Sequence, residues 1–199
     1  GLTVMAVQNE GVQTFAAAVV LSVDVRDETD EDQGVAQMIG DCLDEGTAHR
    51  DAVELAKAAD EIGGSLSGNA SGGGIMCPEK HTLDALKMMR EMVFEPAFAE
   101  REVQRVRDET LQDIKVEEAD PRQVASMRFH KEVYGNHPYS RPSRGDADAV
   151  ASHTSARLLA FHKKWYAPAS GIVAASGPAE VEASLDVLER EFQGLSGTQ

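Results

Sequence analysis

Alternating apolar and polar residues near the start of the chain predict two β-strands. Leu2 to Val7 is rich in residues that favour strands, and Asn9-Glu10-Gly11 has the composition of a turn. In Phe15 to Val25, every second residue from Val19 onward is valine or leucine. Successive side chains of a strand point to opposite faces, so these residues share one face. Residues 26–33 are predicted to form a charged loop.

Helical periodicity dominates the rest of the chain, because apolar residues recur three or four positions apart. Caps and breakers set the expected ends of each helix. Three predicted helices have both ends given by the pattern, and these are Gly34–Glu45, Glu100–Glu118 and Thr154–Tyr166. Two more are bounded by their caps and breakers: one is capped by Asp51 and stopped by Gly63-Gly64, and the other is capped by Thr82 and broken by Pro96. A further helix begins at Pro121, and the last one is marked by Val181 and Phe192. The other predicted segments are the strands Ser65–Ala70, Gly74–Cys77 and Ser170–Ser176, a Gly72-Gly73-Gly74 connection, and a loop from Tyr134 to Gly145.

The order of these elements predicts the fold class. Strands come in groups separated by long helical stretches, and strict β-α-β alternation is missing. This order favours an α+β fold, with a mixed, largely antiparallel sheet and helices mainly on one face. We see neither an internal repeat nor a linker long enough to split the chain, so we expect residues 1–199 to form one domain.

Composition is typical of a globular protein, with 42% hydrophobic and 27% charged residues among 199. The sequence has no apolar run of about 18 residues, so no membrane span is expected. It shows no signal peptide and begins with Gly1 instead of Met, so we expect it to be part of a longer, multi-domain chain. The compartment is left open between the bacterial periplasm and the cytoplasm.

The chain is acidic, with 19 basic against 34 acidic residues and a formal net charge of −15. This balance argues against a nucleic-acid partner, because phosphate contacts need clustered Lys and Arg. It favours a solvated surface, and the alternative is a surface that attracts basic peptides. Cys42 and Cys77 form neither a disulfide framework nor a zinc ribbon, and we expect two buried free thiols.

Several short segments in a fixed order resemble one protein family. They are Gly1-Leu2-Thr3-Val4, Arg26-Asp27-Glu28 followed by Gly34-Val35-Ala36, Gly46-Thr47, Glu61-Ile62-Gly63-Gly64-Ser65-Leu66, Leu111-Gln112-Asp113-Ile114, Tyr134-Gly135-Asn136-His137-Pro138-Tyr139-Ser140-Arg141-Pro142, and Trp165-Tyr166-Ala167-Pro168. Together they resemble the M16 zinc metallopeptidases, which include insulinase, pitrilysin and the mitochondrial processing peptidase. The segment from Gly34 to Thr47 has the frame of that family's metal-binding helix.

The resemblance implies which residues stand at the positions of the chemistry. Family members hold zinc with the two histidines of His-x-x-Glu-His and a distant glutamate, and the intervening glutamate is the general base. In this sequence Gln37 replaces the first histidine, Gly40 the general base and Asp41 the second histidine. Asp113 falls at the position of the third ligand.

Each replacement removes a capability. Gln37 is a neutral amide and a poor zinc ligand, and Gly40 has no side chain to act as a base. Glycine within a helix also costs about 1 kcal/mol relative to alanine, so its presence points to close packing. Asp41 and Asp113 can hold a hard cation weakly, but ordinary solvated acids are the favoured interpretation. We therefore predict no catalytic or structural metal in this domain, and zinc in a partner domain or subunit.

No other site replaces the lost one in the sequence. The six histidines show no ligand spacing, and His162 lies on an apolar helix face where a core histidine is expected. A Gly-x-Ser-x-Gly nucleophile motif is also missing. In active relatives a substrate peptide adds as a strand to a sheet edge. The matching positions here are Ser65, Leu66, Ser67, Gly68, Asn69 and Ala70.

Three functions remain open from the sequence. The first is a non-catalytic M16-like domain that helps form a peptide-binding chamber with other M16 domains or a catalytic M16 subunit. The second is a structural scaffold, like the core subunits of respiratory complexes. The third is an active metallopeptidase with an altered metal site, which Gly40 disfavours. An intact His-x-x-Glu-His in the same or an adjacent reading frame would favour the first.

Overall fold

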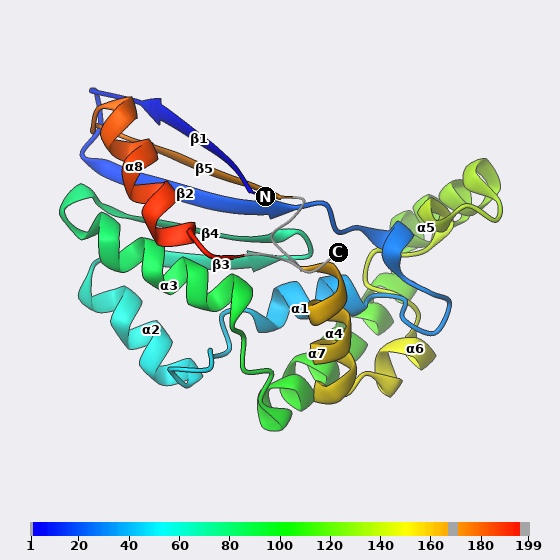
Figure 1. The fold of residues 1–199 in the computed structure, drawn as a ribbon. Helices are drawn as coiled ribbons and strands as arrows, with labels where there is room; N and C mark the ends of the chain where they lie inside the picture. The colour runs from blue at the N-terminus through cyan, green and yellow to red at the C-terminus, as the bar shows by residue number, and fades with distance from the viewer. Residues whose placement is uncertain (1, 167–170, 196–199) are drawn as a thin grey trace.

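The computed structural model describes residues 2–166 and 171–195 (Figure 1). The strands are β1 (Thr3–Gln8), β2 (Thr14–Leu21), β3 (Ser65–Asn69), β4 (Gly72–Pro78) and β5 (Gly171–Gly177). The α-helices are α1 (Val35–Cys42), α2 (Ala52–Glu61), α3 (Thr82–Phe94), α4 (Glu100–Ala119), α5 (Pro121–Tyr134), α6 (Ala147–Ser152), α7 (Ser155–Trp165) and α8 (Val181–Phe192). Short 3₁₀ turns are η1 (Val25–Asp27), η2 (Glu79–His81) and η3 (Pro138–Ser140).

The five strands form one mixed sheet in the order β1-β5-β2-β4-β3. Only β1 and β5 run parallel, and the other neighbouring strands are antiparallel. Helices α3 and α8 pack on one face of this sheet. The predicted α+β class and its largely antiparallel sheet are therefore confirmed.

Strand alternation explains why one face of the sheet is covered. Along β2, Phe15, Ala17, Val19 and Leu21 are buried, and these residues form a core with α1, α3 and α7. On the opposite face Val20 is 52% exposed, and its neighbours across the sheet include the exposed side chain of Ile172 on β5. The sheet therefore separates a packed side from an open side.

Helix α5 stands apart from this core. None of its residues is buried, and its neighbours are α4 and η3 (right side of Figure 1). Its exposed apolar side chains include Phe129 and Val133. Among the described residues, no helix is both long and apolar enough to cross a membrane.

Three local predictions differ from the structure, and one short helix was not predicted. β2 ends at Leu21, and Val25 begins η1 because Asp24 caps that turn with its side chain. Gly72-Gly73-Gly74 belongs to β4 and is not a connection, since all three pair with β2 or β3.

At the start of α3, Thr82 is the first helical residue and not the cap, because its hydroxyl donates to the Glu79 carbonyl. The sequence analysis missed α6, whose first turn is capped by Asp146. Of the predicted segments and landmarks, Gly1, Ala167, Pro168 and Ser170 lie outside the described residues.

Candidate functional site

Helix α1 carries three of the four positions at which the family resemblance places chemistry. It spans eight residues, and its N-cap, Gly34, has no side chain to cap it. The Glu28 carboxylate takes that role, accepting the Gly34 N–H at Oε2 and the Ala36 N–H at Oε1, both at 3.0 Å. Burial raises the pKa of Glu28, and these two backbone hydrogen bonds oppose the rise. A buried carboxylate therefore anchors the start of the helix.

Gln37 and Asp41 are hydrogen-bonded to each other on a half-buried side of α1. The Gln37 Nε2 donates to Asp41 Oδ1 at 2.8 Å, as expected for side chains one helical turn apart. Burial raises the pKa of the Asp41 carboxyl. The Gln37 hydrogen bond and the charge of Arg144 oppose this shift, whereas the charge of Asp113 adds to it. The two positions that would hold histidines thus form a closed polar pair.

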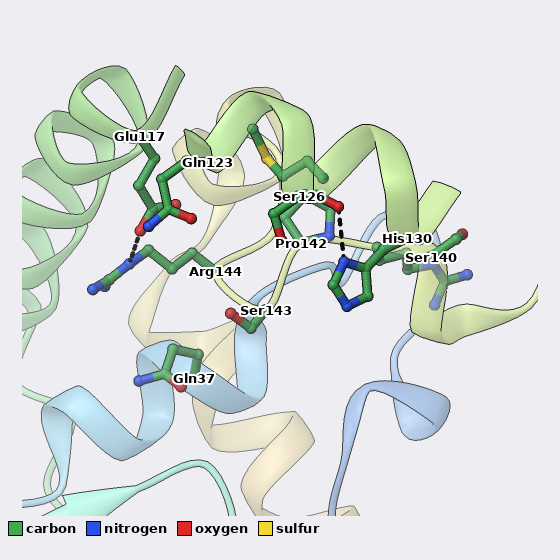
Figure 2. A pocket seen from close by; sticks show the side chains of 11 residues that line it. Gln37, Glu117, Gln123, Ser126, His130, Ser140, Pro142, Ser143 and Arg144 are labelled. Atoms are coloured by element: carbon green, nitrogen blue, oxygen red, sulfur yellow. Dashed lines mark hydrogen bonds and ion pairs between the residues drawn. The ribbon is translucent and has the colours of Figure 1, made fainter. Parts of the chain in front are cut away.

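Asp113 and Glu117 lie one turn apart on α4 and share a single cationic partner. The Arg144 Nη1 lies 3.4 Å from Asp113 Oδ2, and its Nε donates to Glu117 Oε1 at 2.9 Å. Figure 2 shows this guanidinium beside Glu117, with Gln37 of α1 nearby. The structure therefore brings Gln37, Asp41 and Asp113 to one place, and adds Arg144, which the sequence analysis missed.

A crossing of two loops at the start of α1 fixes the backbone of Arg144. Gly34 has φ +81° and Gly145 has φ +79°, conformations that side chains rarely adopt. A Cβ on Gly34 would overlap the Arg144 carbonyl, and one on Gly145 would lie 2.8 Å from the Gly34 nitrogen. The backbone of the loop that carries Arg144 is thus in close contact with the start of the helix that carries Gln37.

Gly40, which the family resemblance puts at the position of the general base, lies against the end of β3. A Cβ there would overlap the Asn69 carbonyl carbon and would lie 2.6 Å from the Ala70 nitrogen. On the other side of this contact, a Cβ on Gly68 would overlap the Gly40 carbonyl and lie 3.0 Å from the Leu43 Cβ. Two glycines therefore allow helix and strand to approach backbone to backbone. The expected close packing at Gly40 is present.

The segment at the positions of the family's peptide strand, Ser65–Ala70, lies along this contact. Its strand, β3, is at the end of the sheet order and pairs with β4 alone within the described part of the chain. The turn that follows is held by Tyr166, whose buried hydroxyl donates to the Ala70 carbonyl at 2.7 Å. The segment is thus an edge strand whose last residues are pinned to α1 and to the end of α7.

An open, polar pocket of about 480 Å³ lies above α1 (Figure 2). Its lining combines Gln37 and Glu117 with residues of α5 and of the loop from η3 to Arg144. The Arg141 guanidinium on its wall is occupied, because it donates to the Glu28 carbonyl at 2.8 Å and pairs with Asp30 at 2.6 Å. The charged residues of its lining, Glu117, Arg141 and Arg144, therefore already have partners.

The residues at this site do not fit zinc. Zinc in proteins favours imidazole and thiolate ligands, and the groups present are an amide and carboxylates. Asp41 already accepts from Gln37, and Asp113 already pairs with Arg144. In residues 2–166 and 171–195, no group of three or more His, Cys, Asp or Glu side chains is arranged to hold a metal ion.

The other residues considered in the sequence analysis, His162 and the two cysteines, are buried in the protein. His162 is buried and its Nε2 donates to the Val93 carbonyl at 2.8 Å, as a core histidine should. Both cysteines are buried and free, so that prediction is confirmed. Burial raises the pKa of the Cys42 thiol to about 12, which leaves it protonated at neutral pH.

Comparison with known proteins gives one family. The family model described as Insulinase (Peptidase family M16) matches residues 3–147. An uncharacterized zinc protease of Mycobacterium tuberculosis is 28% identical over 197 residues, covering 96% of this chain and 45% of the relative. The uncharacterized zinc protease YmxG of Bacillus subtilis is 26% identical over 182 residues, covering 89% of this chain and 44% of YmxG. The chain thus spans about half the length of these curated relatives.

Solved structures share the fold along the whole chain. A peptidase M16 inactive domain from Pseudomonas fluorescens superposes with a TM-score of 0.90 at 24% identity, covering 100% of this chain and 49% of that one. A protease from Helicobacter pylori has a TM-score of 0.90 at 21% identity, with the same two coverages of 100% and 49%. At these identities the likeness establishes the fold.

Proposed function

The chain belongs to the insulinase family, peptidase family M16, and on that premise we propose that it is a non-catalytic domain of a zinc protease. Its role is to help form the chamber that encloses a peptide, while another domain or subunit of the same family carries the zinc. The observation that carries this proposal is Gly40. The position of the general base has no side chain and is filled by the backbone of Asn69 and Ala70.

The neighbouring positions support the same conclusion. Metal-assisted peptide hydrolysis needs an ion with an open coordination position and a base that activates its water. Gln37 and Asp41 are bonded to each other, and Asp113 is paired with Arg144. Neither requirement is met by these groups, so this chain contributes shape and surface and not the cleavage step.

The lengths of the relatives support a partner domain. The Mycobacterium tuberculosis zinc protease and the Pseudomonas fluorescens M16 structure are about twice as long as this chain, because it covers 45% and 49% of them. One of the solved structures is a peptidase M16 inactive domain. A second domain or subunit with an intact His-x-x-Glu-His is therefore part of the proposal.

The test compares the isolated chain with the natural protein or complex that contains it. We expect the isolated chain to hold no stoichiometric zinc by elemental mass spectrometry and to leave quenched fluorescent peptides intact. The complete assembly should contain zinc and cleave them in a manner that a chelator abolishes. Zinc-dependent cleavage by the isolated chain would establish an active peptidase with an altered site instead. An assembly without zinc or cleavage would favour the structural scaffold.

We also propose that β3 lines the chamber and contacts the peptide. Strand addition uses backbone groups, so it survives the side-chain changes on α1. The segment Ser65–Asn69 is an edge strand, and the small residues Ser65, Ser67 and Gly68 leave much of its backbone uncovered by side chains. The net charge of −15 favours peptides that carry lysine or arginine.

Hydrogen–deuterium exchange tests this contact. A short extended peptide with several lysines should slow exchange in residues 65–69. The same peptide with methylated backbone nitrogens is the matched control, because it keeps its charge but loses the donors that strand pairing needs. Equal protection by both peptides, or protection elsewhere only, would count against β3 as the binding strand.

A further inference from the structure

Helix α5 and the loop after it form a basic segment in an acidic chain. Residues 121–145, called the basic segment below, contain five of the 19 Lys and Arg residues and one of the 34 Asp and Glu residues. Two of the five cations, Arg141 and Arg144, pair with acids. The other three form no ion pair with any residue that the structure describes, and they are Arg122, Arg128 and Lys131.

The outer side of α5 carries exposed apolar side chains among these cations. Phe129 is 65% exposed, and Val133, one turn further along, is 57% exposed. Residues four apart in a helix lie on the same side, and so does Arg122, two turns before Phe129. The half-buried Val124 and Met127 fall on the opposite side by the same spacing. Aromatic and arginine side chains are enriched in protein–protein interfaces, so this side of α5 has the composition of a contact surface.

The loop before α1 has the opposite charge. Residues 27–32, called the acidic loop below, contain five acids and no base. The side chains of Asp30 and Glu31 are 87% and 88% exposed, although each lies near an arginine. The acidic loop adjoins the basic segment, because η1 packs on η3 and Arg141 pairs with Asp30 (right side of Figure 1). One end of the molecule therefore presents a basic and an acidic surface next to each other.

We propose that this end of the molecule binds a second copy of the chain, with the basic segment of each copy against the acidic loop of the other. The two contacts are reciprocal, which is the arrangement of a two-fold symmetric dimer. Phe129 and Val133 supply an apolar centre, and the two charge contacts fix the orientation of the copies. The inference goes beyond the proposed function and stands without it, because it needs neither a chamber nor a peptide.

The distribution of charge favours a second copy over other anionic partners. A nucleic acid or an anionic membrane extends beyond the basic segment and would meet the rest of the chain, which is acidic enough to give a net charge of −15. A helix that lies on a membrane also needs a wide apolar face, and the outer side of α5 offers Phe129 and Val133 beside Arg122. The acidic loop of a second copy is short, so its contact stays within the basic segment.

The experiment is sedimentation equilibrium of the chain, over a range of protein concentrations, at low and at high NaCl. The wild type should dimerise at low salt, and its dissociation constant should rise about tenfold or more between about 50 mM and about 500 mM NaCl, because salt screens exposed charges. Phe129→Ser should weaken the dimer without changing the charge of the chain. A wild type that stays monomeric at low salt up to about 1 mM protein would overturn the proposal.

Charge reversal identifies the two surfaces. Arg122→Glu with Arg128→Glu makes the basic segment acidic, and Asp30→Lys with Glu31→Lys makes the acidic loop basic. All four side chains are exposed, so both variants should fold, as circular dichroism verifies. Each variant alone should stay monomeric, whereas an equimolar mixture should form a heterodimer because both contacts are complementary again. A mixture that does not associate would contradict the pairing. If the loop variant is unfolded, Glu31→Lys alone takes its place.

The matched control is Lys57→Glu with Arg101→Glu, which changes the net charge as much as the variant of the basic segment does. These two side chains are 74% and 93% exposed, on α2 and α4. The control should dimerise like the wild type. If it loses the dimer to the same extent, the effect is one of net charge and the proposal is wrong. A wild type that stays monomeric but binds phosphatidylglycerol vesicles or a single-stranded oligonucleotide through Arg122 and Arg128 would replace the second copy by that partner.

Discussion

At residue 40, the absence of a side chain has two effects. It leaves no group that could act as the base that the family resemblance implies here, and it allows the backbone of α1 to lie against the backbone of Asn69 and Ala70. A glycine inside a helix is unfavourable when the helix stands alone. Here the close contact compensates for that cost, since any Cβ would have to move β3 or α1.

Replacing Gly40 by alanine separates these two effects. Helix propensity alone predicts a gain of about 1 kcal/mol. The overlap with β3 predicts the opposite sign, a loss of about 1–3 kcal/mol as in other overpacked cores. We expect the loss, measured as the free energy of unfolding in urea. The control is Ala56→Gly, at an exposed position in the middle of α2, which measures the cost of glycine relative to alanine in a helix of this chain. If Gly40→Ala is more stable than the wild type, the close contact with β3 does not exclude a side chain at this position.

The burial of His162 makes the stability of the folded chain depend on pH. Burial lowers its pKa from 6.5, and its hydrogen bond to Val93 only partly opposes this shift. Between the two pKa values the unfolded chain binds more protons than the folded chain, so stability is lost as the pH falls below about 6.5. The pKa of His153 is lowered in the same way and adds to this loss.

The measurement is the free energy of unfolding at pH 7.5 and at pH 6.0. The wild type should be less stable at the lower pH, and His162→Gln should lose part of that difference because it cannot titrate. His130→Gln, on the exposed helix α5, should retain the wild-type difference. An unchanged pH response in His162→Gln would contradict the assignment.

At the scale of elements, α1 depends on residues outside itself. It is short, and its own N-cap provides no side chain. Short isolated helices are unstable in water, so most of the stability of α1 comes from tertiary contacts. Glu28, six residues before Gly34, accepts two N–H groups that the helix leaves free. Sequence periodicity predicted the helix, but it did not reveal this distant cap.

Replacing Glu28 by glutamine tests the cap. An amide has one oxygen where the carboxylate has two, so one of the two buried N–H groups loses its acceptor. We expect a loss of about 1–3 kcal/mol in the free energy of unfolding, the usual cost of an unsatisfied buried group. Glu31→Gln, in the same loop, should change stability by less than about 1 kcal/mol, since the Glu31 side chain is 88% exposed where it pairs with Arg157. Equal effects would argue against a capping role.

At the scale of the molecule, the fold is that of the M16 structures, although the residues at the expected motif positions differ from the family pattern. The sheet, its covered face and the position of α1 agree with M16 structures at a TM-score of 0.90. Around the motif, however, the end of β3 lies against the backbone of Gly40, and Asp113 is paired with Arg144. Restoring the motif residues alone should therefore not restore peptidase activity.

The combined variant Gln37→His, Gly40→Glu, Asp41→His and Asp113→Glu tests this expectation. We expect it to unfold at a lower temperature than the wild type and to leave a fluorescent peptide uncleaved in the presence of zinc. The variant with the other three substitutions but with Gly40 intact should stay closer to wild-type stability, because the Asn69 contact is preserved. If the variant with all four substitutions is stable and cleaves the peptide, the four motif residues alone account for the lack of activity in the wild-type chain.

The sequence by itself determined the α+β class, the order of the elements and the family, because hydrophobic periodicity and short landmarks are local signals. Through the family resemblance it also predicted that Gln37, Gly40, Asp41 and Asp113 stand at the motif positions. Only the tertiary structure decided what surrounds them. Arg144 lies 27 positions after its partner Glu117, and β3 reaches Gly40 through a backbone contact. Such pairings depend on how the loops cross in three dimensions, and the spacing of residues along one helix does not predict these crossings.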